Sequence, residues 1–385
     1  MDRFTETTSV SWGGRLKQSL IGMLIGIVLI IACPFGLFWN EGRAVTTAKS
    51  LDEGAGAVVS VDAGRVDRAN EGRLIHLAGN TDVSDTVADT GFAVTAKALR
   101  LYRRVEMYQW KESTESSTRT KLGGGEETVT TYSYEKAWSN ESINSADFKE
   151  PNGHRNPRMD ISGQDFVAKQ ARLGGFALSR DVLDQLGNWE PLSVPENRLG
   201  AMRSAYRGSK PISLTQDGIY LGNSPDEPVI GDYRITWVVV APGELSVIAK
   251  QVGNSFAEYQ TAAGDGLLMT AEGIKTADDM FAAARTENTI LTWILRGVGL
   301  VLLFVGFMLV GGPLAVFADV IPFIGSIVRL GQGLLAFSAA LLLGGGTIAV
   351  AWFAYRPLLT VAVLAGVAVV IGLFIYAGRR KPAIV

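Results

Sequence analysis

The residue types that most often carry catalysis or bind metals are scarce in this chain. Histidine occurs twice, at His76 and His154, and Cys33 is the single cysteine among 385 residues. Neither histidine has a cysteine or a second histidine at the spacing of metal ligands. No G-x-S-x-G, P-loop or dinucleotide-binding motif with its strand context occurs. We therefore predict no catalytic, cofactor or metal site, and expect both histidines to be structural or solvated.

Asp319 is the carboxylate with the strongest physical claim to a function. It lies in a largely apolar segment, where an acidic group is costly unless it is paired or lies at the headgroup boundary. It can pair with Arg329, a lipid or a partner, or it can simply lie in the cytoplasmic interface, which we favour. Arg43 follows an apolar run and can reach lipid phosphates. The candidate partner or lipid contacts are Asp319, Arg329 and Arg43.

Four apolar, largely uncharged runs predict helices next to these residues. A helix of about 20 residues crosses a hydrocarbon core of roughly 30 Å. We expect transmembrane helices at 19–39, 290–312, 331–355 and 357–377. Cys33 closes a stretch that resembles a bacterial lipobox, but Pro34 and further apolar residues follow it, so we favour an unmodified residue inside the helix.

The intervening segment 313–330 is apolar, yet Pro313 and Pro322 interrupt it. An interfacial or re-entrant helix pair fits this pattern best.

Charge predicts the orientation of the chain. The tails 1–18 and 378–385 are basic, so both termini are expected on the cytoplasmic side. An even number of spans then places residues 40–289 on the opposite side. This segment holds 27 Lys and Arg against 35 Asp and Glu. Such an acidic domain argues against nucleic acid as a partner.

Residues 40–289 are expected to form an α+β domain. Alternating apolar residues predict strands at 73–79, 98–112 and 128–139, the last two as a long hairpin. A second hairpin is expected at 232–251, with Pro242-Gly243 at its turn. Residues 162–186 are predicted to be helical.

Two further patterns concern the ends of helices. Thr276 and Asp279 form a capping box before one long helix that continues into the second span. The tetrad Asn-Glu-Gly-Arg occurs at 40–43 and again at 70–73. We expect Gly42 to end the first span in a left-handed conformation and Gly72 to mark a turn before a strand.

Several of these stretches together resemble the transmembrane protein 43 family. They are NEGRA at 40–44, NEGRLIHLAG at 70–79, LRLYRRVEMYQWKE at 99–112, YSYEKAWSNESINSADF at 132–148, GHRNP at 153–157 and WFAYRPL at 352–358. The resemblance implies four spans with a large domain between the first two. Animal members are similar to integral proteins of the endoplasmic reticulum and inner nuclear membrane, which organise membrane protein complexes, self-associate and contact lamins and emerin. The family implies no enzymatic activity.

The short N-terminal tail and the Ala, Gly and Val content of the spans suggest a bacterial member, located in the cytoplasmic membrane. Lamin and emerin are then not the expected partners. The expected partners are the lipid bilayer, a second copy of the chain and other membrane proteins. We expect a multi-pass, non-catalytic scaffold. The alternatives are a channel or transport component that uses the loop around Asp319 and Arg329, and a membrane-bound enzyme.

Overall fold

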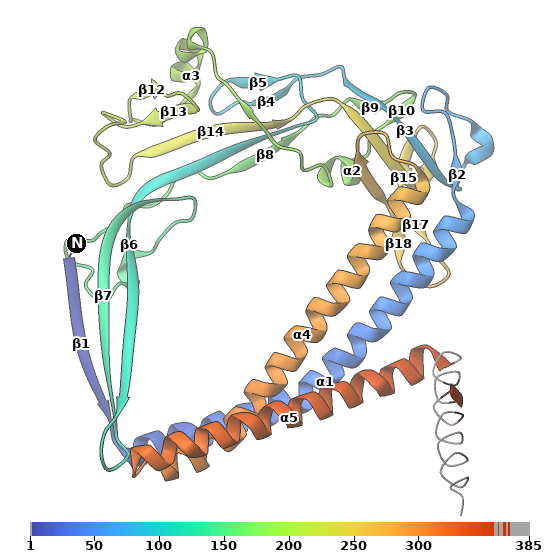
Figure 1. Cartoon of the computed structure of the whole chain (residues 1–385). Helices are drawn as coiled ribbons and strands as arrows, with labels where there is room; N and C mark the ends of the chain where they lie inside the picture. Colours follow the sequence, from blue (N-terminus) through green and yellow to red (C-terminus); the bar gives the residue numbers. More distant parts are fainter. Residues whose placement is uncertain (1, 358–360, 362–364, 367–368, 370–385) are drawn as a thin grey trace, which may run out of the picture. The chain divides into compact units, whose positions relative to one another are not determined.

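The computed structural model describes residues 2–357, 361, 365, 366 and 369, and it divides into two compact units (Figure 1). The β unit contains residues 2–8, 50–117 and 128–283. The helical unit contains residues 9–49, 118–127 and the described residues from 284 onward. The large domain is therefore mainly β, because its helices α2 (Arg180–Asp184) and α3 (Leu199–Ala205) are short.

Within the described part of the chain, three helices are long and apolar enough to cross a membrane: α1 (Trp12–Ala57), α4 (Ala277–Ala318) and α5 (Pro322–Tyr355). They contain the predicted spans 19–39, 290–312 and 331–355. The predicted capping box is confirmed, since Asp279 N donates to Thr276 Oγ1 at 3.1 Å at the start of α4. The predicted span 357–377 lies largely outside the described residues, and the tail 378–385 lies entirely outside them.

Small residues bring the three helices close together. A Cβ on Gly26 of α1 would lie 2.6 Å from the carbonyl oxygen of Gly306 in α4. Close backbone approach of this kind is typical of helix contacts in lipid, where van der Waals packing replaces the hydrophobic effect. A buried cluster joins Cys33 of α1, Leu303 of α4 and Ala340 of α5. Cys33 is therefore a packed residue inside the bundle.

The first Asn-Glu-Gly-Arg tetrad does not end a helix, contrary to our prediction. Helix α1 runs through it to Ala57, and Gly42 is helical. A Cβ on Gly42 would lie 2.7 Å from Cζ of Tyr355, so this glycine permits close packing against α5. In the second tetrad Gly72 has a φ of +75° and precedes strand β3, which confirms the predicted turn.

The segment 313–330 consists of two helix ends and a short turn. Helix α4 continues through Pro313 to Ala318, and α5 begins at Pro322. Proline is tolerated in the first turn of α5 because the N–H it lacks has no partner inside the helix. The placement of this segment at a membrane surface stays a prediction.

An eight-stranded sheet carries the long hairpin. Its order is β1-β7-β6-β14-β13-β12, with β11 paired to β14 and β8 paired to β6. Strand β6 has 21 residues and pairs with β7, so the hairpin predicted at 98–139 is confirmed. Its strands are β1 (Asp2–Val10), β7 (Glu126–Ser139), β6 (Arg100–Thr120), β14 (Tyr233–Val240), β13 (Gly218–Leu221), β12 (Ile212–Leu214), β11 (Glu190–Leu192) and β8 (Gln164–Val167).

A seven-stranded sheet has the order β10-β9-β3-β15-β16, with β19 on β15 and β2 on β3. Its strands are β10 (Phe176–Ala177), β9 (Ala171–Leu173), β3 (Leu74–Val83), β15 (Glu244–Val252), β16 (Ser255–Ala257), β19 (Met269–Glu272) and β2 (Val59–Ser60). Two small hairpins, β4 (Val87–Asp89) with β5 (Val94–Ala96) and β17 (Tyr259–Gln260) with β18 (Gly266–Leu267), complete the strands. Residues of both sheets, among them Leu77, Leu101, Leu173, Ile235 and Val247, share one buried core.

Two predictions for this unit are wrong. Residues 162–186 form strands β8, β9 and β10 and the short helix α2, where we predicted a longer helix. Residues 232–251 form two strands, but not a hairpin with each other. Strand β14 pairs with β6 in one sheet and β15 pairs with β3 in the other, so Pro242-Gly243 marks a crossing between sheets.

Strand β1 was not anticipated from the sequence. It is the edge strand of the eight-stranded sheet, next to β7, as Figure 1 shows. Strands that are hydrogen-bonded to each other share one side of a membrane, whereas we expected residues 1–18 and the large domain on opposite sides. The pairing therefore speaks against that separation.

Candidate functional site: two ion-pair networks in the helical unit

Asp319 lies in the turn between α4 and α5, and its side chain is fully buried. Two guanidinium groups hold it. Arg15 Nη2 donates to Asp319 Oδ2 at 2.6 Å, and Arg329 Nη1 donates to both carboxylate oxygens at 2.5 and 2.7 Å. The pairing of Asp319 with Arg329 considered from the sequence is present. Arg15, which the sequence analysis included only within the basic tail 1–18, is the residue that sequence reasoning missed.

A glycine at the start of α5 makes room for this carboxylate. A Cβ on Gly325, in the first turn of α5, would lie 1.8 Å from Asp319 Oδ1. Since carbon and oxygen atoms cannot approach so closely, position 325 requires glycine while the ion pair is intact. The N–H of Asp319 continues the α4 hydrogen bonding by donating to Ala315 O at 3.0 Å.

The tip of the β6–β7 hairpin, residues 118–127, joins the same network. Arg15 Nη1 donates to Gly124 O at 2.6 Å, and Arg15 also pairs with Glu126 at 2.7 Å. Glu126, directly after the triple glycine, therefore contributes a carboxylate to the partners of Arg15. Arg15 itself is only 7% exposed.

Backbone and ring contacts fix the tip to the α4–α5 turn. Gly123 N donates to Val320 O at 3.3 Å, and the indole N–H of Trp12 donates to Val316 O at 3.0 Å. The Trp12 ring also packs edge-on against Phe317, with centroids 5.4 Å apart. Gly124 has a φ of +79°, and a Cβ there would lie 2.5 Å from the Trp12 ring. The triple glycine thus allows the tip to fit closely against the helices.

The second network is built on the first Asn-Glu-Gly-Arg tetrad. Glu41, which is 1% exposed, accepts hydrogen bonds from Arg296 at 2.6 and 2.8 Å and from the Trp352 indole at 2.9 Å. Arg296 also lies over the Trp293 ring, 4.6 Å from its centroid. One carboxylate of α1 is therefore bonded to α4 and α5 together.

Arg43 and Arg296 both have partners on neighbouring helices. Arg43 donates to Asn288 Oδ1 and Thr292 Oγ1, both at 3.0 Å, and to Asn40 Oδ1 at 3.3 Å. Arg296 is buried against Glu41. Both arginines bind helices to one another. Whether Asp319, Arg329 or Arg43 also contacts a lipid or a partner stays a prediction.

Two buried carboxylates of the β unit also have several partners. Asp89 is 1% exposed and binds Arg103 at 2.8 and 2.9 Å and the indole N–H of Trp237 at 3.0 Å. Burial works against ionisation of Asp232, but hydrogen bonds from Tyr220, Val229 N and Lys210 still lower the pKa of its carboxyl. These contacts link strands and stabilise the sheets.

Both histidines are buried and contact other residues of the β unit. Of the two alternatives that we expected, a structural or a solvated histidine, the structural one applies. His76 contacts Ser60 Oγ at 3.2 Å and Lys275 O at 2.9 Å. His154 stacks on Tyr134 with ring centroids 4.0 Å apart. Burial and the hydrogen bond donated to Glu112 raise the pKa of Tyr134 to about 12. Among the described residues, no group of three or more His, Cys, Asp and Glu side chains is arranged to hold a metal ion.

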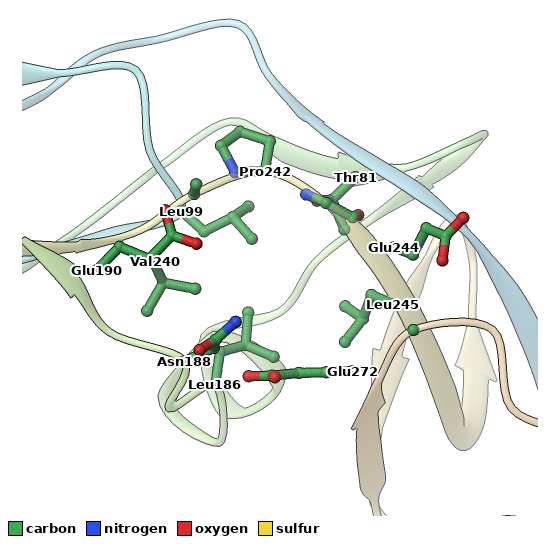
Figure 2. A pocket seen from close by; sticks show the side chains of 13 residues that line it. Thr81, Leu99, Leu186, Asn188, Glu190, Val240, Pro242, Glu244, Leu245 and Glu272 are labelled. Carbon is green, nitrogen blue, oxygen red and sulfur yellow. The ribbon is translucent and has the colours of Figure 1, made fainter.

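Figure 2 shows a cavity of about 300 Å³ where β14 passes into β15. The carboxylates of Glu190, Glu244 and Glu272 and the amide of Asn188 line it together with Leu99 and Leu245. All four polar side chains are solvent-exposed, and the lining contains no His, Cys, Lys or Arg.

Comparison with known proteins identifies the family. The family model described as transmembrane protein 43 matches residues 107–357. The chain is 33% identical to mouse transmembrane protein 43 over 356 residues, which cover 89% of this chain and 87% of the mouse protein. This chain belongs to the transmembrane protein 43 family.

The human member is 33% identical over 92% of this chain and 90% of its own length. The Drosophila homolog is 29% identical over 89% of this chain and 90% of its own length. No solved structure matches the chain. These members of the family are named as transmembrane proteins, with no enzymatic name.

Proposed function

We propose that this member of the transmembrane protein 43 family is a non-catalytic scaffold that is embedded in a bilayer and presents its β unit to other membrane proteins. The observation that carries the proposal is the continuity of the helices. Helix α1 ends at Ala57, directly before β2, and α4 begins at Ala277, shortly after β19. Stiff helical connections of this kind suit a protein that positions partners.

The two ion-pair networks border an apolar stretch of the helical unit. From Arg15 to Glu41 along α1 is about 39 Å, and from Arg296 to Ala318 along α4 is about 33 Å, at a rise of about 1.5 Å per residue. A hydrocarbon core is roughly 30 Å thick. Buried charges thus lie near both ends of an apolar layer of suitable thickness. Because β1 pairs with β7, the N terminus is part of the β unit. The side of the membrane on which the N terminus and the β unit lie is tested by cysteine labelling.

The assembly role includes self-association as well as binding of other membrane proteins. Many large apolar side chains on the three helices are exposed, among them Leu24, Phe35, Trp293, Leu335 and Leu342. Lipid chains or neighbouring helices cover such side chains in a membrane. No nucleic-acid partner belongs to this proposal.

A channel or transport component remains the alternative, in which the turn around Asp319 and Arg329 lines a path. The geometry supports it less well than the scaffold. The Asp319 carboxylate already binds two guanidinium groups and is fully buried, so its charge is neutralised by fixed partners. A carboxylate that binds a permeating ion has to be accessible to that ion, and the buried Asp319 carboxylate is not.

Two experiments on the full-length protein distinguish these functions. Chemical cross-linking followed by mild detergent extraction is expected to recover a complex of fixed stoichiometry, either of copies of this chain or with other membrane proteins. Recovery of the monomer alone contradicts the scaffold. In liposomes, ion or solute flux that is lost in Asp319→Asn and kept in Arg158→Gln, an exposed arginine of the β unit, would favour transport.

A further inference from the structure

The outer surface of the hairpin tip carries an apolar side chain that is almost fully exposed. Leu122 is 89% exposed at the apex of an otherwise polar hairpin. The turn is held by its own hydrogen bonds, since Lys121 N donates to Gly125 O at 2.7 Å and Gly124 N donates to Lys121 O at 3.0 Å. Leu122 is therefore held outward on an ordered turn.

Exposed apolar side chains of the α4–α5 turn extend the same surface. The hydrogen bond from Gly123 N to Val320 O places Leu122 next to this turn. Val320 is 47% exposed, Ile321 54% and Phe323 73%. Trp12, at the start of α1, is half-buried beneath the tip, and Trp is enriched at the boundary between lipid and water.

Cationic side chains surround this apolar surface. Arg119 and Lys121 are 74% and 46% exposed and both pair with Glu127, which lowers the pKa of the Glu127 carboxyl. The side chain of Arg329 is 42% exposed. The tip and its contacting helix ends hold five cations, Arg15, Lys17, Arg119, Lys121 and Arg329, against three carboxylates, whereas the whole chain has a net charge of −2.

We propose that the hairpin tip and the α4–α5 turn form a binding surface for anionic phospholipid, with Leu122, Ile321 and Phe323 among the upper acyl chains and Arg119, Lys121 and Arg329 at the headgroup phosphates. Apolar residues bordered by Lys and Arg are the signature of segments that lie in the interface. A lipid leaflet also explains why a polar hairpin ends in an exposed leucine next to the apolar helices. The proposal does not depend on the scaffold function.

The depth of the tip in the bilayer is measured first. Leu122→Cys, in a parent with Cys33→Ala, is spin-labelled in full-length protein in nanodiscs. Ser116→Cys, on the same hairpin six positions before the apex, is the control. We expect the label at Leu122 to collide more often with oxygen than with a water-soluble nickel complex, and the label at Ser116 to show the reverse. Equal access of the nickel complex to both labels overturns the proposal.

The lipid preference is measured next. A fluorophore on Leu122→Cys is quenched by doxyl-labelled phosphatidylglycerol or phosphatidylcholine. Each cation near an anionic surface contributes about 1 kcal/mol, or about fivefold in affinity. Arg119→Gln with Lys121→Gln should therefore reduce a preference for phosphatidylglycerol by up to about 25-fold, and Arg158→Gln should leave it unchanged. Equal quenching by both lipids in the parent, or an unchanged preference in the double variant, contradicts the assignment.

Discussion

Replacing Asp319 by Asn tests whether the buried ion pair holds the helical unit together. The change removes the charge but keeps the shape of the side chain. Arg15 is then left 7% exposed with Glu126 and the Gly124 carbonyl as its remaining partners. Arg329, whose side chain is 42% exposed, can regain water. The cost therefore falls mainly on Arg15.

The magnitude follows from this difference in burial. Removing one partner of a buried pair costs about 3–5 kcal/mol. Because Arg15 keeps Glu126, we expect the lower end, about 3 kcal/mol. Arg329→Gln breaks a partly exposed pair, for which a loss of up to about 1 kcal/mol is typical. Replacing both charges, as in Arg15→Met with Asp319→Leu, should recover most of the loss, since no buried charge is then unpaired.

Cys33 provides the assay. It is the single cysteine and is 9% exposed in the cluster with Leu303 and Ala340, so a thiol-reactive dye reports opening of the bundle during heating in detergent. For a unit of this size, about 3 kcal/mol corresponds to a fall in Tm of about 6–12 °C. A fall of under about 2 °C for Asp319→Asn, or an equal fall for Arg329→Gln, would refute this account of the network.

Three further predictions concern other features. Gly325→Ala should cost about 1–3 kcal/mol by crowding the buried carboxylate, seen as a lower Tm in the same assay, and a Tm equal to the parent's contradicts the close contact. Cysteines at Thr5 and Asn140, placed singly in the Cys33→Ala parent, should react with an impermeant reagent from the same side of a vesicle, because β1 and β7 are paired; labelling from opposite sides means that the pair is not formed in membranes. Because the pKa of Tyr134 is raised to about 12, the unfolded chain loses this proton first as pH rises above its ordinary value near 10. The stability contributed by Tyr134 should therefore be complete below pH 10 and lost between about pH 10 and 12, and Tyr134→Phe should flatten that part of the profile.

The helical unit was largely predictable because its signals are local. Runs free of charge predicted α1, α4 and α5, and the Thr276 capping box predicted where α4 begins. The partners within the unit were not predictable from one sequence. Arg15 and Asp319 are separated by 304 positions, and nothing near either residue indicates the other. The same holds for Glu41 and Arg296, which are also far apart in the sequence. We expected the first span to end next to Glu41, whereas helix α1 continues to Ala57.

The β unit was less predictable because long-range pairing decides its strands. Residues 162–186 contain Ala171, Leu173 and Phe176, which are buried strand positions, whereas Gly174 has a φ of +57° in the turn between β9 and β10. We predicted a helix through this stretch. Strand β15 lies directly after β14 in sequence, but it pairs with β3. A short turn motif at Pro242-Gly243 cannot show which sheet the second strand will join.

The pairing of β1 with β7 sets an order for biosynthesis. Strand β1 ends at Val10, and its partner begins at Glu126, so the ribosome has to add every intervening residue before the edge of the sheet can close. At about 5–20 residues per second, that delay is roughly 6–25 s. Helix α1 leaves the ribosome during this interval and has to enter lipid while the strand before it is still unpaired. Pairing of β1 therefore follows the emergence of α1, while strands β12, β13 and β14 of the same sheet are synthesised later still.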